Sequence, residues 1–76
     1  MKKLERIIVN PTIMGGKPCI KGTRITVGTI VDMIAYGYSF ERVLEAYPLL
    51  KREDLEEALR YAAYRVHEQD IPLQVA

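Results

Sequence analysis

The sequence is poor in the residues that build metal centres and disulfides, with one cysteine and one histidine among 76 residues. Cys19 alone cannot form an internal disulfide, and Cys19 with His67 is too small a ligand set for a closed metal site. Cys19 stands between Pro18 and Ile20, where a buried, small apolar side chain is a simpler interpretation than a reactive thiol. We therefore expect no disulfide, no metal and no cofactor.

Catalytic groupings are equally scarce. His67 is the single imidazole, and no serine or cysteine is spaced to pair with it as a nucleophile. Neither G-x-x-x-x-G-K-[ST] nor G-x-G-x-x-G occurs, and Pro18 directly after the lysine of GGKP blocks the helix that a phosphate loop needs. These absences argue against an enzyme.

Long apolar runs are also missing. No stretch approaches the roughly 20 apolar residues that span a bilayer, and charges interrupt the start of the chain, where a signal peptide has its apolar core. We expect a cytoplasmic protein without membrane association.

What is present is an ordinary globular composition, with 49% hydrophobic and 28% charged residues. A chain this short buries only about 60% of its unfolded surface, so a partner would add useful stability. We expect a homodimer. Each chain is predicted to be a single domain over residues 1–76, with a β-arm at 1–26, a helical core at 27–68 and a tail at 69–76.

Charge is distributed unevenly along the chain. Residues 1–38 contain six basic and two acidic side chains, net +4, whereas residues 39–76 contain five basic and eight acidic ones, net −3. Such asymmetry suits a polyanion at one end and a basic partner at the other. A solvated surface that is lopsided by chance remains an equal alternative.

Short β-branched runs and turn residues characterise the first third of the chain. Residues 6–9, 18–20 and 24–26 predict three short strands. The last two are expected to form a hairpin through Lys21-Gly22-Thr23, and strands this short need a helix to pack on. The glycines that we assign to tight turns are Gly15, Gly16 and Gly22.

Apolar residues then recur at helical spacing. Thr26 is placed to cap a first helix, which Gly37 ends. Ser39 is placed to cap a second helix, which Pro48 stops after little more than two turns. This order predicts a mainly α fold in which a long helix precedes a helix-turn-helix, as in homeodomain-like and winged-helix-like domains.

A third helix is predicted from about residue 53 to about residue 68. Lys51 occupies its cap position, although serine or threonine would cap it better. Four carboxylates follow in its first turns, and we interpret them as solvated groups that the helix dipole favours. The apolar face of this helix consists of Leu55, Ala58, Leu59, Ala62 and Val66, and the four carboxylates are Glu53, Asp54, Glu56 and Glu57.

The segment IMGGKPCIKGTRITV, the Tyr-Gly-Tyr-Ser that ends the first helix, and YPLLKREDLEEALRYAAY together resemble the bacterial and archaeal family called domain of unknown function 433. The resemblance covers the chain from about residue 6 to about residue 66. It implies a small dimeric helix-turn-helix protein with an N-terminal β-arm. It also implies an antitoxin of a toxin–antitoxin pair, with a PIN-like nuclease as the cognate toxin.

Two functions remain open from the residues. Clustered cations favour contacts with the phosphates of operator DNA, which would let an antitoxin repress its own operon. The acidic start of the third helix would repel DNA, and it favours a dimeric protein-interaction module without DNA binding. The candidate DNA contacts are Lys17, Lys21, Arg24, Lys51 and Arg52.

Overall fold

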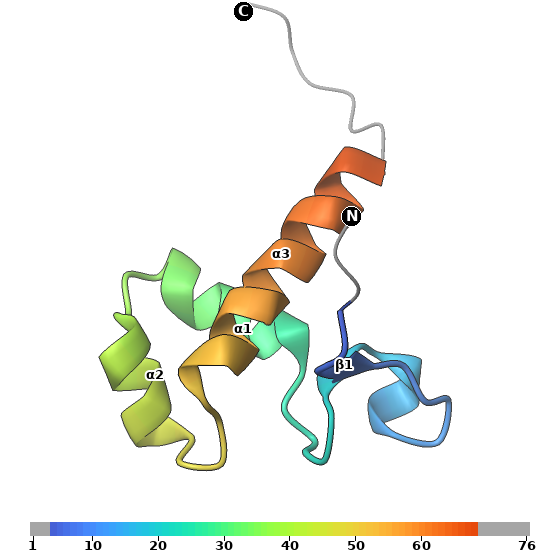
Figure 1. Cartoon of the computed structure of the whole chain (residues 1–76), viewed down its shortest axis with the longest axis horizontal. Coiled ribbons are helices and arrows are strands. Elements are labelled where there is room, and N and C mark those ends of the chain that lie inside the picture. The colour runs from blue at the N-terminus through green and yellow to red at the C-terminus, as the bar shows by residue number, and fades with distance from the viewer. Residues whose placement is uncertain (1–3, 69–76) are drawn as a thin grey trace, which may run out of the picture.

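The computed structural model describes residues 4–68 as three helices with a small sheet at the N-terminal side (Figure 1). This confirms the prediction of a mainly α fold with an N-terminal β element. The predicted tail at 69–76 lies outside the described residues. In chain order the elements are β1 (Ile7–Ile8), the 3-10 turn η1 (Met14–Gly16), β2 (Cys19–Ile20), α1 (Val27–Ala35), α2 (Phe40–Ala46) and α3 (Arg52–Glu68).

The ends of α1 are fixed by local chemistry that the sequence predicts correctly. The Thr26 hydroxyl accepts a hydrogen bond of 3.0 Å from the backbone N–H of Thr29, as an N-cap should. At the other end Gly37 adopts φ +98° and donates to the Ile34 carbonyl, while the N–H of Tyr38 donates to the Met33 carbonyl. These two bonds form a Schellman motif, which ends the helix at the glycine.

The following two helices begin differently from each other. Ser39 caps α2, with its hydroxyl accepting from the N–H of Arg42 at 3.1 Å. Lys51 has no side-chain acceptor, and Asp54, three residues on, compensates. One oxygen of the Asp54 carboxylate accepts from the Lys51 N–H at 2.8 Å, which supplies half of a capping box. This reversed cap explains how α3 begins after a lysine.

The small sheet differs from the predicted hairpin in which strands it pairs. β2 pairs antiparallel with β1, matching Ile7 with Ile20. Residues 24–26 form no strand and contribute one isolated bridge, from Thr26 to Cys19. The predicted hairpin therefore closes through one residue pair, with the Ile20 N–H donating to the Ile25 carbonyl at 3.0 Å, and its second strand is cut short because α1 begins at Val27. The Thr23 hydroxyl bonds the Ile20 carbonyl at 2.9 Å and holds the turn closed.

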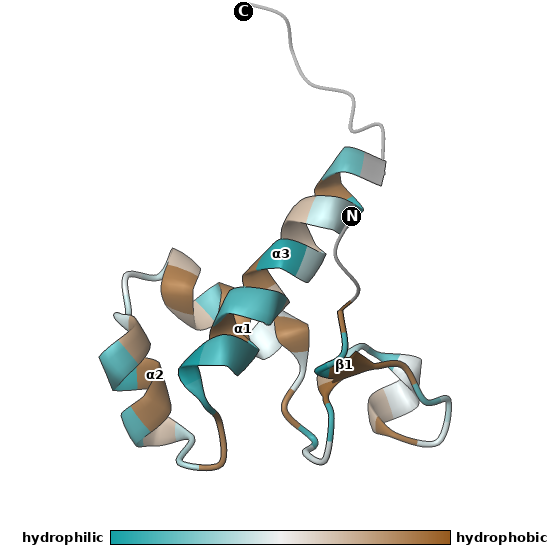
Figure 2. Ribbon diagram, viewed as in Figure 1, coloured by the Kyte–Doolittle hydropathy of each residue, from teal (hydrophilic) through white to brown (hydrophobic). Residues whose placement is uncertain are grey.

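The core lies where β2 meets the three helices. Cys19 is 1% exposed beside it, as expected for a small apolar side chain. Figure 2 shows hydrophobic residues on β1 and α1, and hydrophilic residues on the first turns of α3 that face the viewer. Val66, predicted to share the apolar face of α3, is instead 58% exposed, because the last turns of α3 extend beyond the other helices (Figure 1). The buried cluster consists of Ile20, Val27, Ile30, Val43, Leu50, Leu55 and Ala58.

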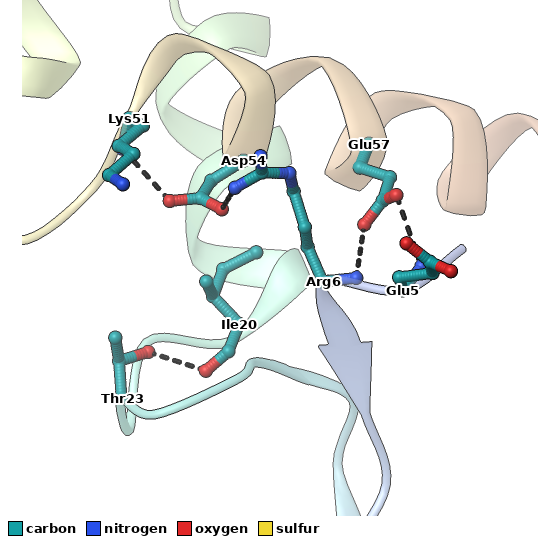
Figure 3. Close-up of polar contacts among 7 residues, drawn as sticks. All are labelled: Glu5, Arg6, Ile20, Thr23, Lys51, Asp54 and Glu57. Atoms are coloured by element: carbon teal, nitrogen blue, oxygen red, sulfur yellow. Dashed lines mark hydrogen bonds and ion pairs between the residues drawn. The ribbon is translucent and has the colours of Figure 1, made fainter.

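Two buried carboxylates of α3 hold the start of the chain against this core (Figure 3). Glu57 accepts the backbone N–H of Glu5 with one oxygen, at 3.1 Å, and that of Arg6 with the other, at 2.6 Å. The Arg6 guanidinium donates to Asp54 at 3.1 Å. Asp54 and Glu57 are each 6% exposed. We refer to Glu5, Arg6, Asp54 and Glu57 as the α3 clamp.

The α3 clamp corrects the interpretation of the acidic turn as fully solvated. Asp54 and Glu57 lie three residues apart, on the buried side of α3 beside Leu55 and Ala58. Their partners are 48 to 52 residues away in the sequence. Helical periodicity alone gives no sign of such partners.

We predict that Glu57→Ala lowers the free energy of unfolding by roughly 1.5–3 kcal/mol, the range for hydrogen bonds to charged groups, because two backbone N–H groups lose their acceptor. Glu53→Ala is the matched control. Glu53 is exposed on the same helix, and its loss should change stability by no more than about 0.5 kcal/mol. Urea denaturation followed by circular dichroism measures both. Equal effects of the two changes would contradict the clamp.

The turn at Gly22 yields a second prediction. Gly22 has φ +82°, and a Cβ built on it has no neighbour within 4 Å, so only backbone strain opposes a side chain there. Gly22→Ala should lower thermal stability by about 1 kcal/mol or more. Gly28 lies within α1 without positive φ, so Gly28→Ala should raise stability by roughly 0.5–1 kcal/mol. A stabilising effect of both changes would remove the strain argument.

Candidate nucleic-acid interface

The α3 clamp brings two of the predicted cationic positions to one end of the molecule. The Lys21 N–H donates to the Arg6 carbonyl at 2.7 Å, and the Arg6 guanidinium reaches Asp54, which in turn accepts from the Lys51 N–H. Three hydrogen bonds therefore connect the turn after β2 to the start of α3. In Figure 1 the turn after β2 and the loop that leads into α3 lie at the lower edge of the view.

Basic side chains are exposed at this end. Lys21, Arg24 and Lys51 are exposed, and the side chain of Arg6 remains 41% exposed despite its ion pair. The ion pairs within residues 4–68 involve none of Lys21, Arg24 and Lys51. We refer to Lys21, Arg24 and Lys51 as the basic end. The sequence pattern does not indicate Arg6 as a neighbour of this group, because its proximity depends on the distant Asp54.

Burial of the clamp carboxylates changes the electrostatics at the start of α3. The carboxylates of Asp54 and Glu57 accept hydrogen bonds from Arg6 and from backbone N–H groups, so their oxygens point into the protein and not into solvent. Glu53 and Glu56 remain on the exposed side. Repulsion of a polyanion by this helix is therefore weaker than four solvated carboxylates would produce.

Arg52 is occupied by protein contacts. Its guanidinium carbon lies 4.9 Å from the centre of the Phe40 ring, a cation–π distance. The guanidinium also forms two ion pairs, from Nη1 to a carboxylate oxygen of Glu41 at 3.6 Å and from Nε to one of Glu56 at 3.8 Å. These contacts join the start of α2 to the start of α3, so Arg52 is placed as a structural residue at the junction of the two helices.

Lys17 lies apart from the basic end. Its side chain lines an open groove of about 590 Å³ between α1 and α3, together with Arg65 and Asp32. The structure thus divides the five predicted cations into three at the basic end, one at the helix junction and one in a separate groove.

The glycines assigned to turns all have positive φ: +66° at Gly15, +83° at Gly16 and +82° at Gly22.

None of the described helices is long and apolar enough to cross a membrane. Among residues 4–68, no group of three or more histidine, cysteine, aspartate or glutamate side chains is arranged to hold a metal ion.

Comparison with known proteins gives one consistent family. The family described as protein of unknown function DUF433 matches residues 7–62. Uncharacterized protein y4eO of Sinorhizobium fredii is 41% identical over 58 residues, which are 76% of this chain and 26% of that protein. This chain therefore spans about a quarter of the length of that curated relative.

A solved structure supports the same assignment. The crystal structure of a DUF433 member protein from Anabaena variabilis superposes with a TM-score of 0.77 at 33% identity, over 83% of this chain and 62% of that one. The family match over residues 7–62 includes β1, β2, α1, α2 and most of α3. On these grounds the chain belongs to the DUF433 family of proteins of unknown function.

Proposed function

We propose that the chain is an antitoxin-like, dimeric helix-turn-helix protein that binds operator DNA through its basic end and neutralises a PIN-like nuclease toxin. The observation that carries the DNA-binding part is the grouping of Lys21, Arg24 and Lys51 beside the N-terminal turn of α3. Exposed lysine and arginine side chains supply most of the affinity for the DNA backbone. The toxin partner rests on the family resemblance.

In this proposal α2, residues 47–51 and α3 form the helix-turn-helix, with α3 as the helix that approaches the groove. α2 has seven residues, and Ser39 and Pro48 limit it at its two ends. Lys51 immediately precedes α3, so its side chain would meet the phosphates that flank the groove. Lys21 and Arg24 would reach the backbone from the neighbouring turn.

A second candidate is a dimeric protein-interaction module without DNA binding. Glu53 and Glu56 are exposed on the first turns of α3, and Arg52 is already engaged with Glu41 and Glu56. The side of α3 that would enter a groove is therefore still acidic. This observation favours a basic protein partner over DNA.

Salt dependence of DNA binding separates the two candidates. Lys21→Ala with Arg24→Ala should weaken binding to operator and random DNA alike, and should lower the slope of log affinity against log salt by about two units, one for each lost phosphate contact. Arg42→Ala is the control, since Arg42 is exposed on α2 and its guanidinium lies 5.9 Å from the Tyr38 ring centre. Gel shifts at several salt concentrations measure the slope.

The same variants define the contrary outcome. If circular dichroism shows unchanged helicity and the double variant binds DNA as the unaltered chain does, the basic end does not contact DNA. If neither the unaltered chain nor the double variant binds DNA measurably, the interaction module is favoured.

Toxin neutralisation needs its own experiment. The proposal requires a PIN-like nuclease as the cognate toxin; expression of that nuclease should arrest growth, and co-expression of the chain should restore it. Restored growth with the double variant Lys21→Ala, Arg24→Ala is also expected, since the proposal separates toxin binding from DNA binding. Growth arrest that the unaltered chain does not relieve would count against an antitoxin.

A further inference from the structure

The groove between α1 and α3 carries charges of both signs that the described part of the chain leaves unpaired. Asp32 reaches it from α1 and Arg65 from α3, and both side chains are exposed. The ion pairs within residues 4–68 involve neither of them. Lys17 adds a second cation to the lining.

Apolar residues also line the groove. Val31, Tyr61 and Ala62 contribute to the lining, and all three are only partly buried. One helical turn beyond Ala62, Val66 is 58% exposed on the part of α3 that extends past the other helices. A partly covered apolar surface on so small a domain is a site where association gains stability.

We propose that this groove is a twofold interface with a second copy of the chain, in which Asp32 of each copy pairs with Arg65 of the other. A twofold axis brings the same patch of both copies together, so a patch that forms ion pairs with its own copy must contain both signs of charge. Here Asp32 and Arg65 lie in one groove on two different helices. One axis then creates two identical ion pairs around the apolar surface.

Other occupants match this groove less well. Nucleic acid would be attracted by Lys17 and Arg65 and repelled by Asp32, whereas the basic end presents three cations. A uniformly acidic or uniformly basic protein segment would leave one sign unpaired. The inference rests on the dimeric part of the proposed function and is independent of DNA binding and of the toxin.

Charge reversal tests the interface directly. In Asp32→Arg both pairs become arginine facing arginine, and in Arg65→Asp both become aspartate facing aspartate. Each change should raise the dimer dissociation constant by about tenfold or more, because like charges then face each other at both pairs. The double variant exchanges the two charges and should restore the dimer. Light scattering on a concentration series measures the mass against the 8.7 kDa of one chain.

Mixing the two single variants gives a sharper result. A copy with Asp32→Arg has two arginines in the groove, and a copy with Arg65→Asp has two aspartates. The equimolar mixture should form a heterodimer more tightly than either variant forms a homodimer. Arg60→Asp and Glu45→Arg are matched controls on exposed positions of α3 and α2 outside the groove, and both should leave the dissociation constant unchanged.

The contrary outcomes are distinct. An unaltered chain that is monomeric at micromolar concentration overturns the interface and the proposed dimer together. An unaltered dimer that tolerates both single reversals, or a double variant that folds and stays monomeric, overturns the interface while the dimer stands. Circular dichroism of each variant identifies loss of folding. Formation of the mixed heterodimer supports the interface, because each arginine of one copy then pairs with an aspartate of the other.

Discussion

The carboxylate of Glu57, which accepts two consecutive backbone N–H groups from the start of the chain, is the contact on which the arrangement of this protein depends. β1 and β2 have two residues each, and a sheet of that size is not stable by itself. Glu57 fixes the backbone just before β1 against α3, and Arg6 adds an ion pair to Asp54. The sheet is therefore held by a helix that follows it in the sequence by more than thirty residues.

The neighbouring carboxylate, that of Asp54, organises the proposed DNA-binding surface. Asp54 accepts from Arg6 on one oxygen and from the Lys51 N–H on the other, so one side chain both starts α3 and anchors the β-arm. Lys21 joins through the Arg6 carbonyl. Two lysines from distant parts of the chain thus have a common support, and the buried carboxylates that create it are removed from the surface that a polyanion would meet.

Local chemistry explains which features the sequence predicts correctly. Thr26, Gly37 and Ser39 fix helix ends through bonds to residues three positions away, and all three act as predicted. The second strand of the predicted hairpin is reduced to one bridge at Thr26, because the residue that pairs with Cys19 also caps the helix that begins directly after it. The buried state of Asp54 and Glu57 depends on residues 5 and 6, and Arg52 is withdrawn from the cationic group by Phe40. A charge pattern cannot reveal such partners without the tertiary fold.

The burial of Cys19 has a practical consequence for following the motions of this protein. Its thiol is 1% exposed and donates to the Lys17 carbonyl, while its backbone lies between β1 on one side and the bridge to Thr26 on the other. A thiol reagent can reach the sulfur only after the sheet separates or the cap of α1 opens. Because the chain has no other cysteine, its alkylation rate reports that local opening without an engineered probe.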